Sequence, residues 1–161
     1  MTNPPLPLFD SEHIWVADDC DYVRLVLLRG FERYGRAMHV RFFPDGSALV
    51  QHAAKVDCGP NVLLLDIQMP GMSGLDALKC LRAFSAFAQT TVIVFSGSDN
   101  PDHVAEACNR GAQLFLRKPD SPAEFETITE LLTSRAESLR SLPFAHFQDV
   151  SDLKRALSLT S

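Results

Sequence analysis

Five polar side chains with the capacity for chemistry stand at the ends of four short apolar runs in this sequence. Asp18 and Asp19 close the run IWVADD, Asp66 closes VLLLD, Ser96 follows TVIVF, and Lys118 follows LFLR. Carboxylates can bind a hard cation or act as nucleophiles, while a hydroxyl and an ammonium can donate hydrogen bonds to oxygen atoms. Each residue alone is typical of a helix cap, a solvated turn or an exposed position. The chemistry therefore depends on whether the fold brings these side chains together.

The apolar runs have the length of buried parallel strands, which are hydrophobic on both faces. They cover residues 14–17, 62–65, 92–95 and 114–116, and a mixed run at 39–43 is typical of an edge strand. Helical patterns with apolar residues three or four positions apart separate these runs, over residues 23–34, after Asp45-Gly46, over 75–82 and over 101–110.

The last helix of the predicted domain has the clearest start. Ser121 is placed as its N-cap, Pro122 fits the first helical position, and Glu124 completes a capping box, while the apolar face extends to Leu139. Five strands that alternate with five helices predict an α/β domain with one doubly wound parallel sheet, because each parallel crossover needs a covering helix. We expect this domain to span residues 13–139.

The segments outside this domain are short. Residues 1–12 are rich in proline and polar residues, which predicts a flexible lead-in, and a weak PxxP spacing lies within it. Residues 140–161 form a tail, in which Val150, Leu153 and Leu157 have helical spacing and predict a short amphipathic helix. We expect the tail to pack on its own domain, with pairing to a second copy or docking on a target as the alternatives.

Composition excludes several classes of partner. The net charge of −5 disfavours binding to a nucleic-acid backbone, and no apolar run is long enough to span a bilayer. The four cysteines are scattered and form neither a CxxC pair nor a zinc-ligand cluster. We therefore expect a cytoplasmic protein with reduced thiols, without a membrane or nucleic-acid partner.

The carboxyl ends of parallel strands lie at one edge of a sheet, and ligands bind there near the point where strand order reverses. If the first and third strands are neighbours, the carboxylates of Asp18, Asp19 and Asp66 converge. Like charges at that distance cannot all stay ionised without a cation. Mg²⁺ suits such a set because it prefers oxygen ligands and keeps several waters.

Four segments together resemble the signature of response-regulator receiver domains: DD at 18–19, LLLDIQMPGMSG at 63–74, FSG at 95–97 and FLRKP at 115–119. The resemblance covers roughly residues 13–139. It implies a flavodoxin-like sheet of five parallel strands in the order 2-1-3-4-5, with five helices. It also implies that Asp66 accepts a phosphoryl group from a phosphohistidine on a histidine kinase or a histidine phosphotransfer protein.

The resemblance assigns roles to the other site residues. Asp19 would bind Mg²⁺ directly and Asp18 mainly through water, while Asp66 and the backbone carbonyl of Gln68 would complete the protein ligands. A carboxylate can be the nucleophile in phosphoryl transfer, and the metal offsets the charge of the phosphoryl oxygens.

Lys118 and Ser96 would each contact a phosphoryl oxygen, and the Lys118–Pro119 bond is cis in typical members of the family. Ser96 and Phe115 match a pair of residues that acts as a coupled switch. In that interpretation the Ser96 hydroxyl moves toward the phosphoryl group and Phe115 rotates into the vacated space. We therefore expect Phe115 to become more buried on phosphorylation.

The residues after the predicted domain are too few for a DNA-binding domain with its own core. We therefore expect a stand-alone receiver that signals to a protein target or serves as a phosphorelay intermediate. Two alternatives remain open. A haloacid-dehalogenase-like phosphatase would need an aspartate where this chain has Gln68. A degenerate receiver, used only as a binding surface, would not need the site residues that this chain retains.

Overall fold

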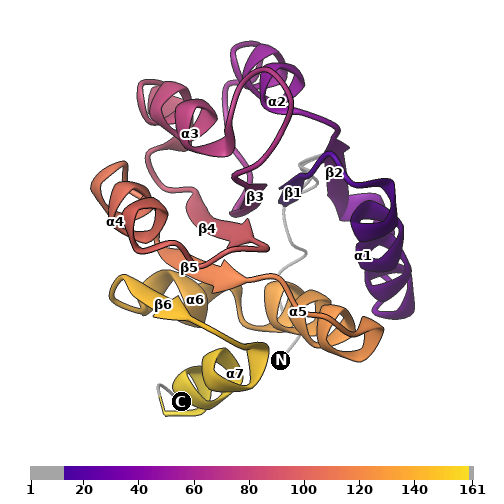
Figure 1. Ribbon diagram of the computed structural model, residues 1–161. Helices are drawn as coiled ribbons and strands as arrows, with labels where there is room; N and C mark the ends of the chain where they lie inside the picture. The colour runs from indigo at the N-terminus through magenta and orange to yellow at the C-terminus, as the bar shows by residue number, and fades with distance from the viewer. Residues whose placement is uncertain (1–12, 160–161) are drawn as a thin grey trace, which may run out of the picture.

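The computed structural model describes residues 13–159, so the predicted lead-in and its PxxP spacing lie outside the described residues (Figure 1). The strands are β1 (Ile14–Ala17), β2 (Val40–Phe43), β3 (Val62–Asp66), β4 (Thr91–Ser96), β5 (Leu114–Arg117) and β6 (Ala145–Phe147). The α-helices are α1 (Asp21–Arg33), α2 (Gly46–Ala53), α3 (Gly74–Arg82), α4 (Pro101–Asn109), α5 (Pro122–Ser134), α6 (Ala136–Ser141) and α7 (Val150–Ser158). Two short 3-10 turns, η1 (Ala37–His39) and η2 (Ser85–Phe87), complete the set.

All the strands run parallel in one sheet, in the order β2-β1-β3-β4-β5-β6. The chain moves outward from β1 to β2 and then crosses back to β3, so the order reverses at β1 and β3. Helices α2, α3 and α4 cover one face of the sheet, and α1, α5 and α7 cover the other (Figure 1). This arrangement confirms the predicted doubly wound α/β fold.

The apolar runs form strands because both of their faces are covered. Every residue of β1, β3 and β4 is buried, and their side chains divide between two hydrophobic clusters, one on each face of the sheet. Trp15 of β1 lies in one cluster, where its ring is 5.1 Å from that of Phe43 and 5.5 Å from that of Phe87. The buried strands therefore give the residues at their ends a rigid base.

The sheet has six strands and the described chain has seven α-helices, where five of each were expected. The extra strand, β6, pairs with β5 through only three residues, Ala145 to Phe147, and all three are half-buried. A strand of three residues is too short to contain the apolar run by which the other strands were predicted. The predicted last helix is also broken after α5, and its expected final residue Leu139 lies instead on α6.

The segment that the sequence predicted to be a tail supplies β6 and α7. Asp149 caps α7 by accepting a hydrogen bond from the amide of Asp152 at 2.9 Å. Val150, Leu153 and Leu157 are buried in the same cluster as the apolar side chains of α1 and α5. The described part of this segment therefore packs on its own domain and covers the edge of β5.

Among residues 13–159, no helix has both the length and the apolar character needed to cross a membrane.

Candidate metal centre at the carboxyl ends of the strands

The reversal of strand order brings the predicted carboxylates together. Asp18 and Asp19 follow β1, Asp66 ends β3, and these two strands are neighbours with Ala17 opposite Leu65. One carboxylate oxygen from each of the three aspartates lies within 4.8 Å of the others. Asp18 and Asp66 are 1% and 4% exposed, whereas Asp19 is exposed. The cluster therefore has a buried base and one side that solvent can reach.

Lys118 reaches this cluster from the end of β5. Its ammonium is 2.7 Å from Oδ2 of Asp18 and 3.2 Å from Oδ2 of Asp66, so it joins the two buried carboxylates. The same ammonium lies 5.6 Å from the centre of the Phe95 ring on β4, the strand it crosses. The backbone amide of Lys118 donates to the carbonyl of Ser96 at 2.7 Å. Both ends of the lysine are thereby fixed.

Burial and neighbouring charges shift the pKa values of Asp66 and Lys118. Burial raises the pKa of Asp66, and the negative charge of Asp18 adds to that effect, while Lys118 opposes it; the pKa is about 6. Burial by itself would lower the pKa of Lys118, but its hydrogen bond and charge interaction with Asp18, joined by Asp66, raise the pKa overall. Lys118 is therefore an ammonium at neutral pH, and Asp66 is ionised above about pH 6.

The turn after β3 sets the position of Asp66. The Gln68 amide donates to Oδ1 of Asp66 at 3.3 Å, and the Gly74 amide donates to the Ile67 carbonyl at 2.8 Å. A side-chain Cβ at residue 74 would lie 1.8 Å from the Asp66 carbonyl oxygen, so only glycine allows this approach. Gly71 has a φ of 76°, which favours glycine in the turn that leads to α3.

The donor set fits a hard divalent cation. Three carboxylates face one ammonium, which leaves an excess of two negative charges when all are ionised. Carboxylate oxygens suit Mg²⁺, and a cation between them would oppose the effects of burial and of the Asp18 charge, which raise the pKa of Asp66. Gln68 lies next to the cluster, and the role of its backbone carbonyl as a ligand stays a prediction.

Ser96 and Phe115 are buried residues of the neighbouring strands β4 and β5. Ser96 is the last residue of β4, and its Oγ accepts a hydrogen bond from the Ser98 amide at 3.2 Å. Phe115 on β5 is fully buried, and its ring meets that of His146 on β6 edge-on at 5.3 Å. Phe115 cannot become more buried than this, so the expected increase in burial has no room here. Its role as a switch stays a prediction.

The peptide bond between Lys118 and Pro119 differs from what the resemblance implied. Residues 13–159 contain no cis peptide bond, so this bond is trans.

Arg24 is a residue of this site that sequence reasoning missed. Its Nη1 donates to the backbone carbonyl of Asp18 at 2.5 Å, and its Nη2 pairs with the carboxylate of Asp21. The available signal was a cation near the start of α1, where the partial positive charge of a helix N-terminus disfavours one.

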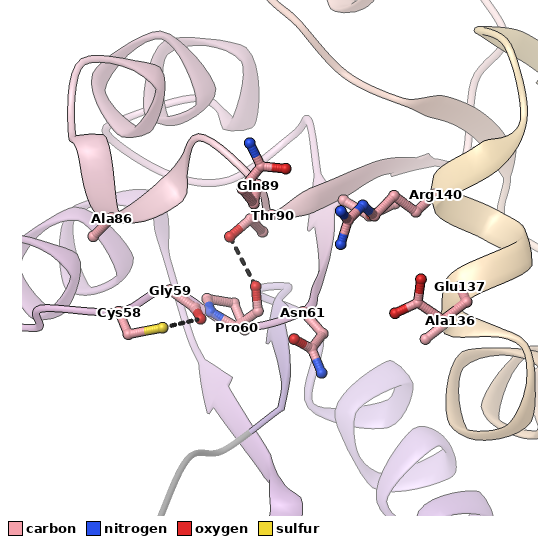
Figure 2. A pocket seen from close by; sticks show the side chains of 11 residues that line it. Cys58, Gly59, Pro60, Asn61, Ala86, Gln89, Thr90, Ala136, Glu137 and Arg140 are labelled. Carbon is pink, nitrogen blue, oxygen red and sulfur yellow. Dashed lines mark hydrogen bonds between the residues drawn. The ribbon is translucent and has the colours of Figure 1, made fainter. Parts of the chain in front are cut away.

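Two hollows on the described part of the chain are not lined by these carboxylates. A pocket of about 120 Å³ lies between the start of β4, the loop before β3 and helix α6, at the opposite end of the sheet. Figure 2 shows the side chains that line it. Glu137 and Arg140 line it from helix α6. A larger groove of about 670 Å³ lies between α4 and β6, and His146 is among its lining residues. The acidic cluster therefore stands apart from both.

Known proteins share sequence and fold with this chain. The family model described as the response regulator receiver domain matches residues 14–130. The sensory/regulatory protein RpfC of Xanthomonas campestris is 35% identical over 128 residues, which are 77% of this chain and 17% of that protein. The DNA-binding transcriptional regulator NtrC of Escherichia coli is 33% identical over 106 residues, which are 66% of this chain and 21% of that protein. The chain thus spans a minor part of these relatives.

Solved structures show the same fold. The chemotaxis protein CheY4 of Vibrio cholerae has a TM-score of 0.61 and 25% identity, over 74% of this chain and 92% of that one. A CheY-like receiver domain protein from Methanospirillum hungatei has a TM-score of 0.65 and 18% identity, over 78% of this chain and 94% of that one.

Proposed function

Since this chain belongs to the family of response regulator receiver domains, we propose that Asp66 is the residue that accepts its phosphoryl group. Receiver domains are the phosphoacceptor modules of two-component signalling. The donor is a phosphohistidine on a histidine kinase or a histidine phosphotransfer protein, and Mg²⁺ bound at the acidic cluster is the cofactor.

One observation carries this proposal: a buried carboxylate at the end of a central strand lies within reach of two other carboxylates and one ammonium. The rigid strand β3 fixes Asp66, and Lys118 supplies a positive charge 3.2 Å from its oxygen. A nucleophile for phosphoryl transfer needs this combination of fixed position and charge compensation.

In the transfer, an oxygen of ionised Asp66 attacks phosphorus while the bond from phosphorus to the histidine nitrogen breaks, which leaves an acyl phosphate and a free imidazole. The ammonium of Lys118 then pairs with a phosphoryl oxygen in place of the Asp66 oxygen. Ser96 is the hydroxyl donor to a second phosphoryl oxygen. When bound, Mg²⁺ offsets the negative charge of the carboxylates and the incoming group. The domain thereby catalyses only its own phosphorylation and dephosphorylation.

The conformational change reaches the edge of the sheet that is formed by β5 and β6. A shift of Ser96 toward the phosphoryl group changes the packing around Phe115, whose ring contacts His146. His146 lines the groove between α4 and β6, so a change at Asp66 alters a surface that a protein can read. The partner that binds this surface is a downstream protein target, the next member of a phosphorelay, or a second copy of the chain.

The state of the cysteines indicates the cellular compartment. Cys20, Cys58, Cys80 and Cys108 are free thiols, which favours a reducing compartment, and we place the protein in the cytoplasm. The regulatory and DNA-binding activities named for RpfC and NtrC belong to those longer proteins.

The proposal is tested by incubation with acetyl phosphate or with a phosphorylated histidine kinase. We expect the wild-type protein to incorporate phosphate only when Mg²⁺ is present, and Asp66→Asn to incorporate none. Asp76→Asn, which changes an exposed aspartate of α3, is the matched control and should label normally. Equal labelling of wild type and Asp66→Asn would contradict the assignment.

A further inference from the structure

The loop between β1 and α1 carries two of the three clustered carboxylates. Asp18 is held on every side: its amide donates to the Phe43 carbonyl at 3.1 Å, its Oδ1 accepts from the Cys20 amide at 2.9 Å, and its Oδ2 contacts Lys118. Asp19 is exposed, and no hydrogen bond or ion pair between described residues involves its carboxylate. The direction of its side chain therefore depends on the backbone of this loop.

The start of α1 does little to fix that backbone. Cys20 is the N-cap residue, and its side chain makes no capping hydrogen bond. Helices usually obtain such a bond from serine, threonine, aspartate or asparagine. The loop thus lacks the device that fixes Asp45, Ser73 and Ser121 at the starts of α2, α3 and α5.

Arg24, on helix α1, contacts the backbone of this loop. Its guanidinium donates to the Asp18 carbonyl at 2.5 Å and to the Asp21 carboxylate, so it bridges the loop and the first turn of α1. Asp21 is 95% exposed, and an ion pair so open to water contributes little. The Arg24 side chain itself is 22% exposed, so the bond to the Asp18 carbonyl is the better protected of the two. A cation here opposes the helix dipole, and a role in positioning the loop explains its presence.

We propose that Arg24 is a positioning residue that holds the loop from Asp18 to Cys20 so that Asp19 faces the bound cation. This inference rests on the proposed function, because the cation is the Mg²⁺ of the receiver site. Arg24 acts through the backbone carbonyl of Asp18 and touches neither the metal nor the phosphoryl group. Residues that orient metal ligands commonly affect metal affinity by about tenfold or more.

The sign of the effect separates positioning from charge. Arg24 is a cation close to a cation site, so its removal would strengthen Mg²⁺ binding if electrostatics alone mattered. Loss of loop positioning would instead weaken binding. The two accounts therefore predict opposite changes in the same dissociation constant.

The experiment is calorimetric titration of Mg²⁺ into wild type, Arg24→Met, Arg29→Met and Asp21→Asn. Arg29 is an exposed arginine on the same helix, so its variant removes the same charge without touching the loop. We expect the Mg²⁺ dissociation constant of Arg24→Met to rise about tenfold. Arg29→Met and Asp21→Asn should stay close to wild type. An unchanged or tighter constant for Arg24→Met would overturn the inference.

Two further readouts keep the inference testable. Without metal, the Cys20 amide should exchange its hydrogen faster in Arg24→Met, because its bond to Asp18 depends on the loop; equal exchange would count against the proposal. With acetyl phosphate, the Mg²⁺ concentration for half-maximal labelling should rise while the maximal rate is kept. If Arg24→Met does not fold, Arg24→Gln replaces it with the same expectations. Failure of wild type to bind Mg²⁺ would refute the proposed function, while the Cys20 exchange would still judge Arg24.

Discussion

The two ends of the sheet bind a partly buried cationic side chain in different ways. At the carboxyl ends of the strands, Lys118 meets the carboxylates of Asp18 and Asp66. At the other end, the guanidinium of Arg82 on α3 donates to the backbone carbonyls of Phe87 at 2.7 Å, Thr90 at 3.1 Å and Gly111 at 2.7 Å. Arg82 therefore ties η2, the start of β4 and the loop after α4 together.

The difference lies in what remains unbalanced. Neutral carbonyl oxygens accept the hydrogen bonds of the Arg82 guanidinium, so this side chain needs no further hydrogen-bond partner. The carboxylate end has three carboxylates and one ammonium, so a further cation would reduce the negative charge that remains when all are ionised. The pocket of Figure 2 lies at the arginine end, away from the carboxylates at which we propose that the chemistry takes place.

The sharpest way to break this comparison is to remove Lys118. In Lys118→Met the buried carboxylates of Asp18 and Asp66 lose their ammonium, and we expect a loss of about 3 kcal/mol in the free energy of unfolding at neutral pH in EDTA. Urea denaturation measures this change. Added Mg²⁺ should restore part of the stability, whereas phosphate labelling should fall strongly. A variant as stable as wild type would show that the buried carboxylates do not need the ammonium of Lys118.

The matching change at the other end is Arg82→Met. It removes the donor to three carbonyls, and we expect a loss of about 2 kcal/mol in stability. Mg²⁺ should not restore it, and folded protein should still be labelled at the wild-type rate. Lys79→Met, an exposed cation on the same helix, controls for charge and should leave stability within about 0.5 kcal/mol. Loss of labelling in folded Arg82→Met would remove the distinction between the two ends.

The smallest expected effect is a gain in stability. Burial raises the pKa of Asp66 from 3.8 to about 6, so the folded state prefers the protonated form. The stability from this proton is fully present below about pH 4 and is lost as pH rises through about 6. Asp66→Asn mimics the neutral form, and we expect it to be more stable than wild type by about 1–2 kcal/mol at pH 7.5 in EDTA. The gain should vanish below pH 4.

Asp76→Asn is the control for this sign. A hydrogen bond from Arg110 lowers the pKa of Asp76, with Ser73 adding to it, so this substitution should bring no gain at pH 7.5. A pH-independent gain for Asp66→Asn would mean that its carboxylate is not strained in the folded protein.

The sequence predicted the elements whose signals are local and strong. Continuous apolar runs identified the buried strands, and the capping box at Ser121 marked the start of α5, where Ser121 Oγ accepts from the Glu124 amide at 3.4 Å. Parallel pairing then required Asp66 and Asp18 to meet once β1 and β3 were neighbours. These inferences depend on composition and topology, which a single sequence carries.

The parts that were missed depend on tertiary packing. Strand β6 pairs with the edge of β5 through three residues, and α7 follows it directly. Its sequence carries no strong strand pattern, so only the tertiary packing shows that it is a strand. The apolar spacing to Leu139 continues past α5, so it does not show the helix break at Arg135. Arg24 gave only a weak signal, because an arginine near a helix start is usually read as a surface residue.

The most direct measurement is to identify the residue that carries the phosphoryl group. Protein phosphorylated with acetyl phosphate and Mg²⁺ is treated with sodium borohydride, which reduces an aspartyl phosphate to homoserine, and the peptides are sequenced by mass spectrometry. We expect homoserine at position 66 alone. Homoserine at position 18 or 19, or labelled protein with an intact Asp66, would contradict the account.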